Sequence, residues 1–167
     1  NNTVERFFPK DYAFSGYDDI SVVPAEANGY VWFYQAPVGY KREASVVDIQ
    51  GYQQKFNFVL AQIDTNKTVI ALTMEDIYAA PFTEDDYAVR SAIEQYNAAL
   101  FEAEKLHSNL KVLDYSEFTR NYPVADLFDW KFYFISQMGI NPKLTKDFQV
   151  WWNRKLESIA LKRKKNR

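Results

Sequence analysis

The residues best suited to chemistry follow apolar runs of the sequence, at the points where each run gives way to polar side chains. They are Gln35, Thr73, Glu75, Asp76, Asp114 and Ser116, and Asp129 could join them from a later segment. Open parallel sheets bind their ligands beyond the carboxyl ends of the strands. Glu75, Asp114 and Asp129 are therefore candidate catalytic carboxylates, which could also hold a hard cation such as Mg²⁺. The alternative is that these residues cap helices and turns, as such residues do in inert domains.

A second candidate region is the aromatic segment DLFDWKFYF at positions 126–134. Such a segment could line a pocket or form a surface for a partner. We therefore expect contacts with a substrate or partner from this segment and from the strand ends, namely from Gln35, Thr73, Trp130, Lys131 and Tyr133. The alternative is that the aromatic rings form core packing over one end of the sheet.

The composition excludes several kinds of active site. The 167 residues include no Cys, so a cysteine nucleophile, a disulfide and a thiolate zinc site are all excluded. A histidine mechanism would have to use His107, which continues the apolar stripe of a predicted helix and is typical of a structural residue. The glycine-rich phosphate loops and the G-x-S-x-G elbow are absent from the sequence. We predict no metal site and no cofactor, apart from the Mg²⁺ alternative.

Charge is unevenly distributed along the chain. The formal net charge is −2 and the isoelectric point is near 5.5, which argues against a general nucleic-acid surface. Residues 162–167 nevertheless hold five cations, which we interpret as a linker to a following domain. The alternatives are a solvated helix end and a contact with phosphate or a membrane surface. The sequence has neither an apolar run that could span a membrane nor a signal peptide, so we expect a cytoplasmic protein.

The residues around these candidates predict the elements that position them. Continuous apolar runs predict buried strands at 20–23, 29–36, 68–74 and 110–115. Apolar residues at helical spacing predict helices at 43–64, from Thr83 to about Ala103, and at 144–164. Residues 1–19 and the stretch between 116 and 143 are expected to be irregular. Strands that alternate with helices favour a three-layer α/β/α fold with a mostly parallel sheet, in a single domain of residues 1–167.

Five segments in the later part of the chain are distinctive: VIALTMEDIY, AIEQYNAALFEA, KVLDYSEF, DWKFYFISQMGINPKL and FQVWWNRKLESIALKRKK. From about Val69 onward the chain resembles, through these segments, the N-terminal region of FkbH-like proteins. Those proteins belong to subclass IIIC of the HAD superfamily and act in bacterial polyketide and capsule-type pathways. In that family a lysine-rich helix end leads into a HAD domain with a D-x-D-x-T nucleophile motif, which does not occur in this sequence. The resemblance implies an adjacent HAD-like domain as a partner.

That family region looks like an SGNH hydrolase, which implies an SGNH-like or flavodoxin-like sheet whose N-terminal part is incomplete in this chain. An active SGNH enzyme has a Gly-Asp-Ser nucleophile and a late Asp-x-x-His, whereas this sequence has Asp129-Trp130-Lys131-Phe132 at the late position. The resemblance thus implies a non-catalytic accessory module that positions a partner or a carrier-linked small molecule for a HAD-type phosphatase or glyceryl-transfer domain. The alternatives are a divergent carboxylate-based hydrolase, of esterase or phosphatase type, and a protein-interaction or structural domain.

Overall fold

The computed structural model describes residues 29–33, 45–75, 86–129, 131, 135 and 140–165. They belong to two compact units: the first unit is Ser15–Ser116, and the second unit combines Asn1–Phe14 with Glu117–Arg167. The predicted strand at 20–23 and the predicted irregular segment 1–19 lie outside the described residues. In the part of the chain that is described, no helix is both long enough and apolar enough to cross a membrane.

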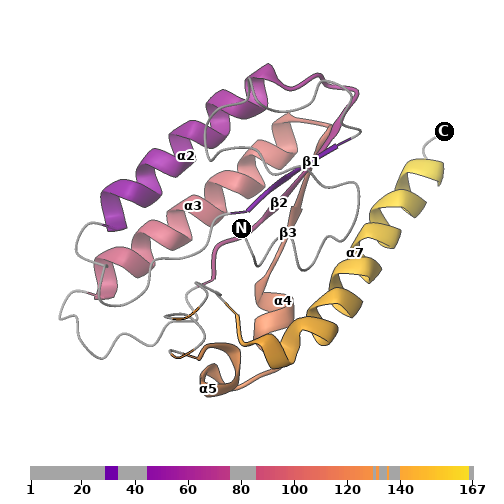
Figure 1. Ribbon diagram of the computed structural model, residues 1–167. Coiled ribbons are helices and arrows are strands. Elements are labelled where there is room, and N and C mark those ends of the chain that lie inside the picture. The colour runs from indigo at the N-terminus through magenta and orange to yellow at the C-terminus, as the bar shows by residue number, and fades with distance from the viewer. Residues whose placement is uncertain are drawn as a thin grey trace. The chain divides into compact units, whose positions relative to one another are not determined.

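Among its described residues, the first unit contains a parallel β-sheet and two helices. Its elements follow in the order β1 (Gly29–Trp32), α2 (Ser45–Gln62), β2 (Thr68–Leu72), α3 (Asp86–Leu106) and β3 (Leu110–Leu113), as Figure 1 shows. The strands lie in the order β1-β2-β3 and both pairs are parallel. Val69 of β2 lies opposite Tyr30 on one side and Leu110 on the other. The predicted α/β fold with a parallel sheet is confirmed.

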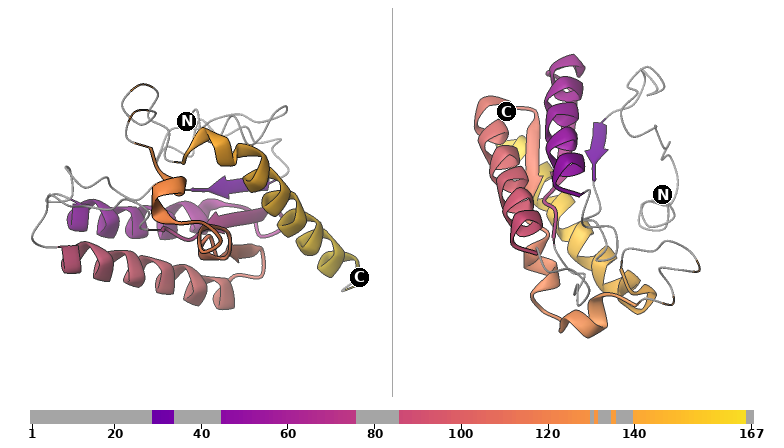
Figure 2. Two further views of the ribbon diagram at one scale, coloured as in Figure 1. Left: turned by 90° about the horizontal axis from the view of Figure 1, so that it is seen from below. Right: turned by 90° about the vertical axis from the view of Figure 1, so that its left-hand side faces the viewer.

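Helices α2 and α3 cover the same face of the sheet (Figure 2). Each crossover moves one strand further in the same direction, and right-handed crossovers of that kind place their helices on one side. Trp32 joins the elements on this face, because its indole N–H donates a 2.7 Å hydrogen bond to the Tyr96 hydroxyl and its ring packs against Tyr52 and Phe56. The apolar helix stripes supply much of the core, including Ile49, Phe56, Leu60, Val89, Ile93, Tyr96 and Leu100.

β2 lies in the middle of the described strands and is deeply buried. Val69, Ala71 and Leu72 are exposed by 2%, 0% and 2% of their surfaces. A strand that is covered on both faces is expected to be apolar at consecutive positions, not only at alternate ones. Ala71 and Leu72 point to opposite faces of β2 and are both buried, so both faces are covered at the carboxyl end of this strand.

Gly29 lies where β1 approaches β2 closely. A Cβ atom at Gly29 would be 3.0 Å from the carbonyl oxygen of Thr68, whereas a Cβ at Gly51 in α2 would meet nothing within 4 Å. We expect Gly29→Ala to lower the free energy of unfolding by about 1 kcal/mol, because the Thr68 oxygen is held in the sheet. The matched change Gly51→Ala should raise it by about 0.5–1 kcal/mol, because alanine is the better helix former. Urea denaturation measures both effects, and changes of the same sign would contradict this local explanation.

The second unit contains short helical turns and one long helix. α4 (Ser116–Thr119) begins at the boundary between the units and is followed by α5 (Val124–Leu127), the 3-10 turn η3 (Pro142–Leu144) and α7 (Thr145–Lys165). The helix predicted at 144–164 is confirmed by α7. The expectation that residues 116–143 are irregular is wrong where α4, α5 and η3 occur, because these turns are short and lack a sequence period that would reveal them.

Aromatic rings pack α4 against α7 within the second unit. Phe118 lies against Tyr122, Phe148 and Trp151, with ring centroids 5.3, 5.4 and 5.9 Å from its own. Trp152 stacks on Phe148 at 6.1 Å. We call these five residues the aromatic cluster. Phe118, Phe148 and Trp152 are each exposed by 4% or less, so the cluster is a hydrophobic core of this unit.

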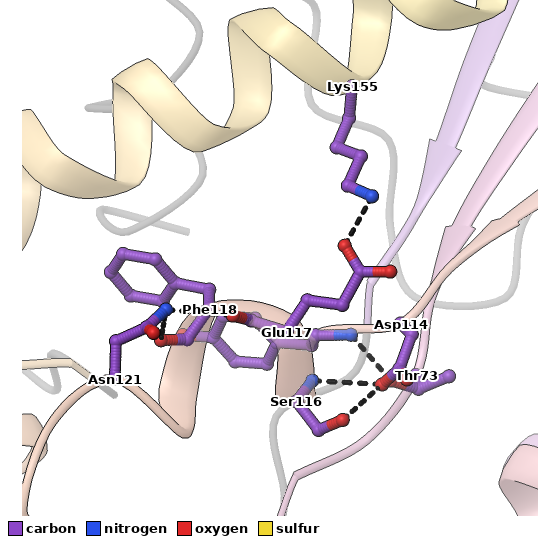
Figure 3. Close-up of polar contacts among 8 residues, drawn as sticks. Thr73, Asp114, Ser116, Glu117, Phe118, Asn121 and Lys155 are labelled. Atoms are coloured by element: carbon purple, nitrogen blue, oxygen red, sulfur yellow. Dashed lines mark hydrogen bonds and ion pairs between the residues drawn. The ribbon is translucent and has the colours of Figure 1, made fainter.

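Polar contacts surround the aromatic cluster. Glu117 of α4 forms an ion pair with Lys155 of α7 (Figure 3). The Tyr122 hydroxyl donates a 3.0 Å hydrogen bond to Asp147 at the start of α7. Asn121 closes α4, because its side-chain amide donates to the Glu117 and Phe118 carbonyl oxygens at 2.9 and 3.2 Å. These bonds satisfy carbonyl groups that such a short helix leaves without an intrahelical partner.

Candidate functional site

The carboxyl ends of β2 and β3 lie side by side because the two strands are parallel neighbours. Thr73 follows β2 directly, and its backbone N–H donates to the Leu113 carbonyl at 3.0 Å. Its hydroxyl accepts a 2.9 Å hydrogen bond from the backbone N–H of Tyr115. The sheet therefore brings four residues together at the carboxyl ends of these strands. We call them the strand-end site: Thr73, Glu75, Asp114 and Tyr115.

Asp114 caps the turn that leads from β3 into α4, as Figure 3 shows. Its Oδ1 atom accepts hydrogen bonds from the backbone N–H of Ser116 at 3.0 Å and from the Ser116 hydroxyl at 2.6 Å. An aspartate in this position satisfies an N–H group that the first turn of a helix leaves without an intrahelical partner. Asp114 thus makes the capping contact that the sequence offered as one of two alternatives, and its role in catalysis stays a prediction.

Tyr115 of the strand-end site is a buried residue with a perturbed pKa. Only 7% of its surface is exposed. Burial raises the pKa of its phenol far above the usual value of about 10, and the negative charge of the nearby Glu75 raises it further. The strand-end site therefore combines a neutral phenol with a half-buried carboxylate at neutral pH.

The raised pKa of Tyr115 predicts a response to alkali. A group whose pKa is raised on folding stabilises the folded state while it is protonated, so this contribution is complete below a pH of about 10 and is lost above it. We expect Tyr115→Phe to remove one ionisation from the high-pH end of an ultraviolet titration. The matched control is Tyr87→Phe, at a tyrosine that is 75% exposed. Identical titration curves for the two variants would contradict the burial of the Tyr115 phenol.

Asn97 of α3 holds the segment that precedes Glu75, and the sequence analysis did not find it. Its side-chain amide accepts a 2.7 Å hydrogen bond from the Met74 N–H and donates a 2.8 Å hydrogen bond to the Met74 carbonyl. The amide thus replaces the peptide group of a neighbouring strand. The sequence contains only a weak indication of this role, because Asn97 is a polar residue next to Tyr96, which belongs to the buried stripe of the helix.

Asp129, the third predicted carboxylate, belongs to the second unit. Its Oδ1 atom accepts a 2.9 Å hydrogen bond from the backbone N–H of Lys131, which closes a short turn. Lys131 is exposed, whereas Phe128 at the start of the aromatic segment is 8% exposed and so belongs to the core. The roles of the other residues named from the sequence stay predictions, because these lie outside the described residues: Gln35, Asp76, Trp130 and Tyr133.

The three carboxylates belong to different units: Glu75 and Asp114 lie in the first unit and Asp129 lies in the second. Among the described residues there is no group of three or more histidine, aspartate and glutamate side chains that could hold a metal ion. A cluster of Glu75, Asp114 and Asp129 would join residues of both units, so it stays a prediction. Asp114 and Asp129 each use a carboxylate oxygen to accept a backbone N–H of a local turn. The Mg²⁺ alternative therefore stays a prediction.

His107, the only histidine of the chain, lies near the amino-terminal end of β3, at the end of the sheet opposite to the strand-end site. α3 runs from the end of β2 back to the beginning of β3, and His107 follows α3 directly. Its backbone N–H donates to the Ala103 carbonyl at 3.0 Å, and its own carbonyl accepts from the Leu110 N–H at 3.1 Å. The chain therefore supplies no imidazole base to the strand-end site.

Comparison with known proteins does not assign a function to these residues. Comparison of the chain with protein-family models finds no match, and comparison with curated proteins and with solved structures finds none either. The functional argument therefore depends on the contacts of the strand-end site and on the sequence itself.

Proposed function

We propose that this chain is a non-catalytic α/β module that positions a substrate or partner for an adjacent HAD-like domain. The main observation behind the proposal is that polar side chains of the strand-end site bind the protein's own backbone. The Thr73 hydroxyl and the Asp114 carboxylate both accept hydrogen bonds from backbone N–H groups of the segment after β3. These hydrogen bonds hold the segment at the carboxyl ends of β2 and β3, where α/β sheets bind ligands. Because the polar groups hold the backbone in place, they support binding of a ligand and not its chemical conversion.

The chemistry of the site argues in the same direction. A hydrolase needs a nucleophile, a base within hydrogen-bond reach and donors for the developing oxyanion. Ser116 comes nearest among the described residues, because its hydroxyl donates to Asp114 at 2.6 Å. The same carboxylate oxygen also accepts from the Ser116 N–H, which keeps it in its capping position. A carboxylate is also a weaker base at neutral pH than an imidazole, whose usual pKa is about 6.5.

The resemblance to FkbH-like proteins supplies the proposed partner. In that family the N-terminal region precedes a HAD domain of phosphatase or glyceryl-transfer type. The ligand that we propose for this module is a carrier-linked small molecule. The compartment that we propose is the cytoplasm. The half-buried carboxylate of Glu75 lies at the edge where such a ligand would be presented. A bound ligand would meet the Glu75 carboxylate as a hydrogen-bond acceptor, while the buried Tyr115 phenol lies behind it.

The proposal is tested by assaying the full chain for esterase activity on p-nitrophenyl acetate and for phosphatase activity on p-nitrophenyl phosphate, with and without Mg²⁺. We expect rates equal to those of the uncatalysed reactions. Glu75→Gln, Asp114→Asn and Asp129→Asn are assayed in parallel, with Glu94→Gln as a control at an exposed carboxylate of α3. An activity that one of the three variants loses and the control keeps would overturn the proposal in favour of a carboxylate-based hydrolase.

A further inference from the structure

The distal half of α7 carries a concentration of positive charge that the rest of the chain lacks. Residues 154–167, which we call the basic segment, contain seven lysines and arginines and one acidic residue, Glu157. The segment therefore has a formal net charge of +6, whereas the whole chain has −2, so the remaining residues carry −8. Such a separation of charge within one chain is typical of an electrostatic binding segment.

The cations of the basic segment exceed what the helix itself requires. α7 is helical through Lys165, so the four cations Lys162, Arg163, Lys164 and Lys165 occupy consecutive helical positions. Four consecutive positions are distributed around the whole circumference of an α-helix. One or two cations in the last turn would complement the helix dipole and the free carbonyl groups. Four cations in a row exceed the number that the helix dipole alone would favour.

Aliphatic residues accompany these cations. In the first half of α7 the apolar side chains are packed inside the second unit, with Phe148 exposed by 4% and Trp152 by 2%. Further along the helix, Leu156 and Ile159 are only half-buried. Lys155 is paired with Glu117, whereas Arg154 is exposed. Basic residues next to partly exposed aliphatic ones form the pattern of helices that lie on anionic lipid surfaces.

We propose that the basic segment binds peripherally to the surface of an anionic lipid bilayer. This inference does not rest on the proposed function. A nucleic acid that followed the protein surface would meet residues with a net charge of −8, which repel it. A layer of anionic headgroups needs contact with the basic segment alone, where lysine and arginine place their charges among headgroups while aliphatic side chains enter the interface.

The experiment is cosedimentation of the full chain with vesicles of phosphatidylcholine alone and with vesicles in which about a third of the lipid is phosphatidylserine. We expect binding to the anionic vesicles only, at about 0.1 M salt, and its loss at about 1 M salt, where the Debye length falls from about 10 Å to about 3 Å. The variant with Lys162→Gln, Arg163→Gln, Lys164→Gln and Lys165→Gln should bind the anionic vesicles at least about tenfold more weakly, since each cation contributes separately.

A matched control removes the same number of charges elsewhere. Arg90, Lys105, Lys143 and Lys146 are all exposed, and their joint replacement by Gln should leave vesicle binding within about twofold of the unchanged chain. Circular dichroism checks that both variants keep the helical content of the unchanged chain. The lipid and salt dependence of the unchanged chain tests the proposal even where a variant does not fold. Equal binding to neutral vesicles, an equal loss in the control, or tighter binding to a DNA duplex than to anionic vesicles would each overturn it.

Discussion

Asn97→Ala is expected to lower the stability of the first unit by about 3 kcal/mol, because it leaves two backbone groups of Met74 without partners. The amide of Asn97 accepts from the Met74 N–H at 2.7 Å and donates to the Met74 carbonyl at 2.8 Å. Met74 is 1% exposed, so water does not readily replace the lost bonds. A buried polar group without a partner costs roughly 1–3 kcal/mol, and this substitution creates two of them.

Gln95→Ala is the matched control for this prediction. Gln95 lies on the same helix but is exposed, and its amide makes a long 3.3 Å hydrogen bond to the Ser91 hydroxyl within that helix. We expect this change to alter stability by less than about 0.5 kcal/mol. Urea denaturation followed by circular dichroism measures both variants. A comparable loss in the two would show that the contact with Met74 does not hold the end of β2.

Phe118→Ala should destabilise the second unit by about 4 kcal/mol, the range for removing a large buried aromatic side chain. Phe118 is 2% exposed and lies within 5.9 Å, between ring centroids, of three other rings of the aromatic cluster. A four-residue helix such as α4 is not stable by itself, so its position depends on this packing. Near-ultraviolet circular dichroism should show weaker tryptophan bands, since Trp151 loses a packing partner.

Val124→Ala provides the comparison within the same unit. Val124 begins α5 and is 49% exposed, so we expect its truncation to cost less than about 1 kcal/mol. Thermal unfolding of the two variants, followed by far-ultraviolet circular dichroism, separates the two effects. If Phe118→Ala were no more destabilising than Val124→Ala, the aromatic cluster would not be the core of this unit.

The long elements could be predicted because each contains several periods of its pattern. The helix predicted at 43–64 is α2 at Ser45–Gln62, and the strand predicted at 68–74 is β2 at Thr68–Leu72. The strand prediction extends two residues too far for a physical reason. Met74 is as buried as the strand residues, but its backbone bonds to the Asn97 side chain instead of to a strand. A run of apolar residues indicates which positions are buried, and burial continues beyond the last residue of β2 that pairs with a neighbouring strand.

The short turns of the second unit could not be predicted from periodicity. α5 and η3 contain four and three residues, about one turn each, so no repeat is available to read. Their positions depend on contacts that are distant in sequence. The Asn141 N–H donates a 2.7 Å hydrogen bond to the Leu127 carbonyl, and Asn141 Oδ1 accepts from the Lys143 N–H at 3.1 Å to begin η3.

The candidate site was only partly predictable for a similar reason. That residues after β2 and β3 share an edge follows from the parallel order of the strands, which the sequence indicates. Whether Asp114 faces a ligand or caps a turn depends on the direction of one carboxylate oxygen, which no spacing encodes. Asn97 acts on a residue 23 positions earlier in the chain, and its neighbours in sequence show only an amphipathic helix.

The strand order β1-β2-β3 also bears on how the first unit assembles during synthesis. Among the described strands, each one pairs with the strand that comes before it in the chain. The paired residues are about 40 positions apart, as Gly29 and Thr68 or Val69 and Leu110 are, so each pairing closes a loop over a single crossover. A growing chain can therefore add one helix–strand pair at a time as it leaves the ribosome, because the edge to which each new strand binds has already been made.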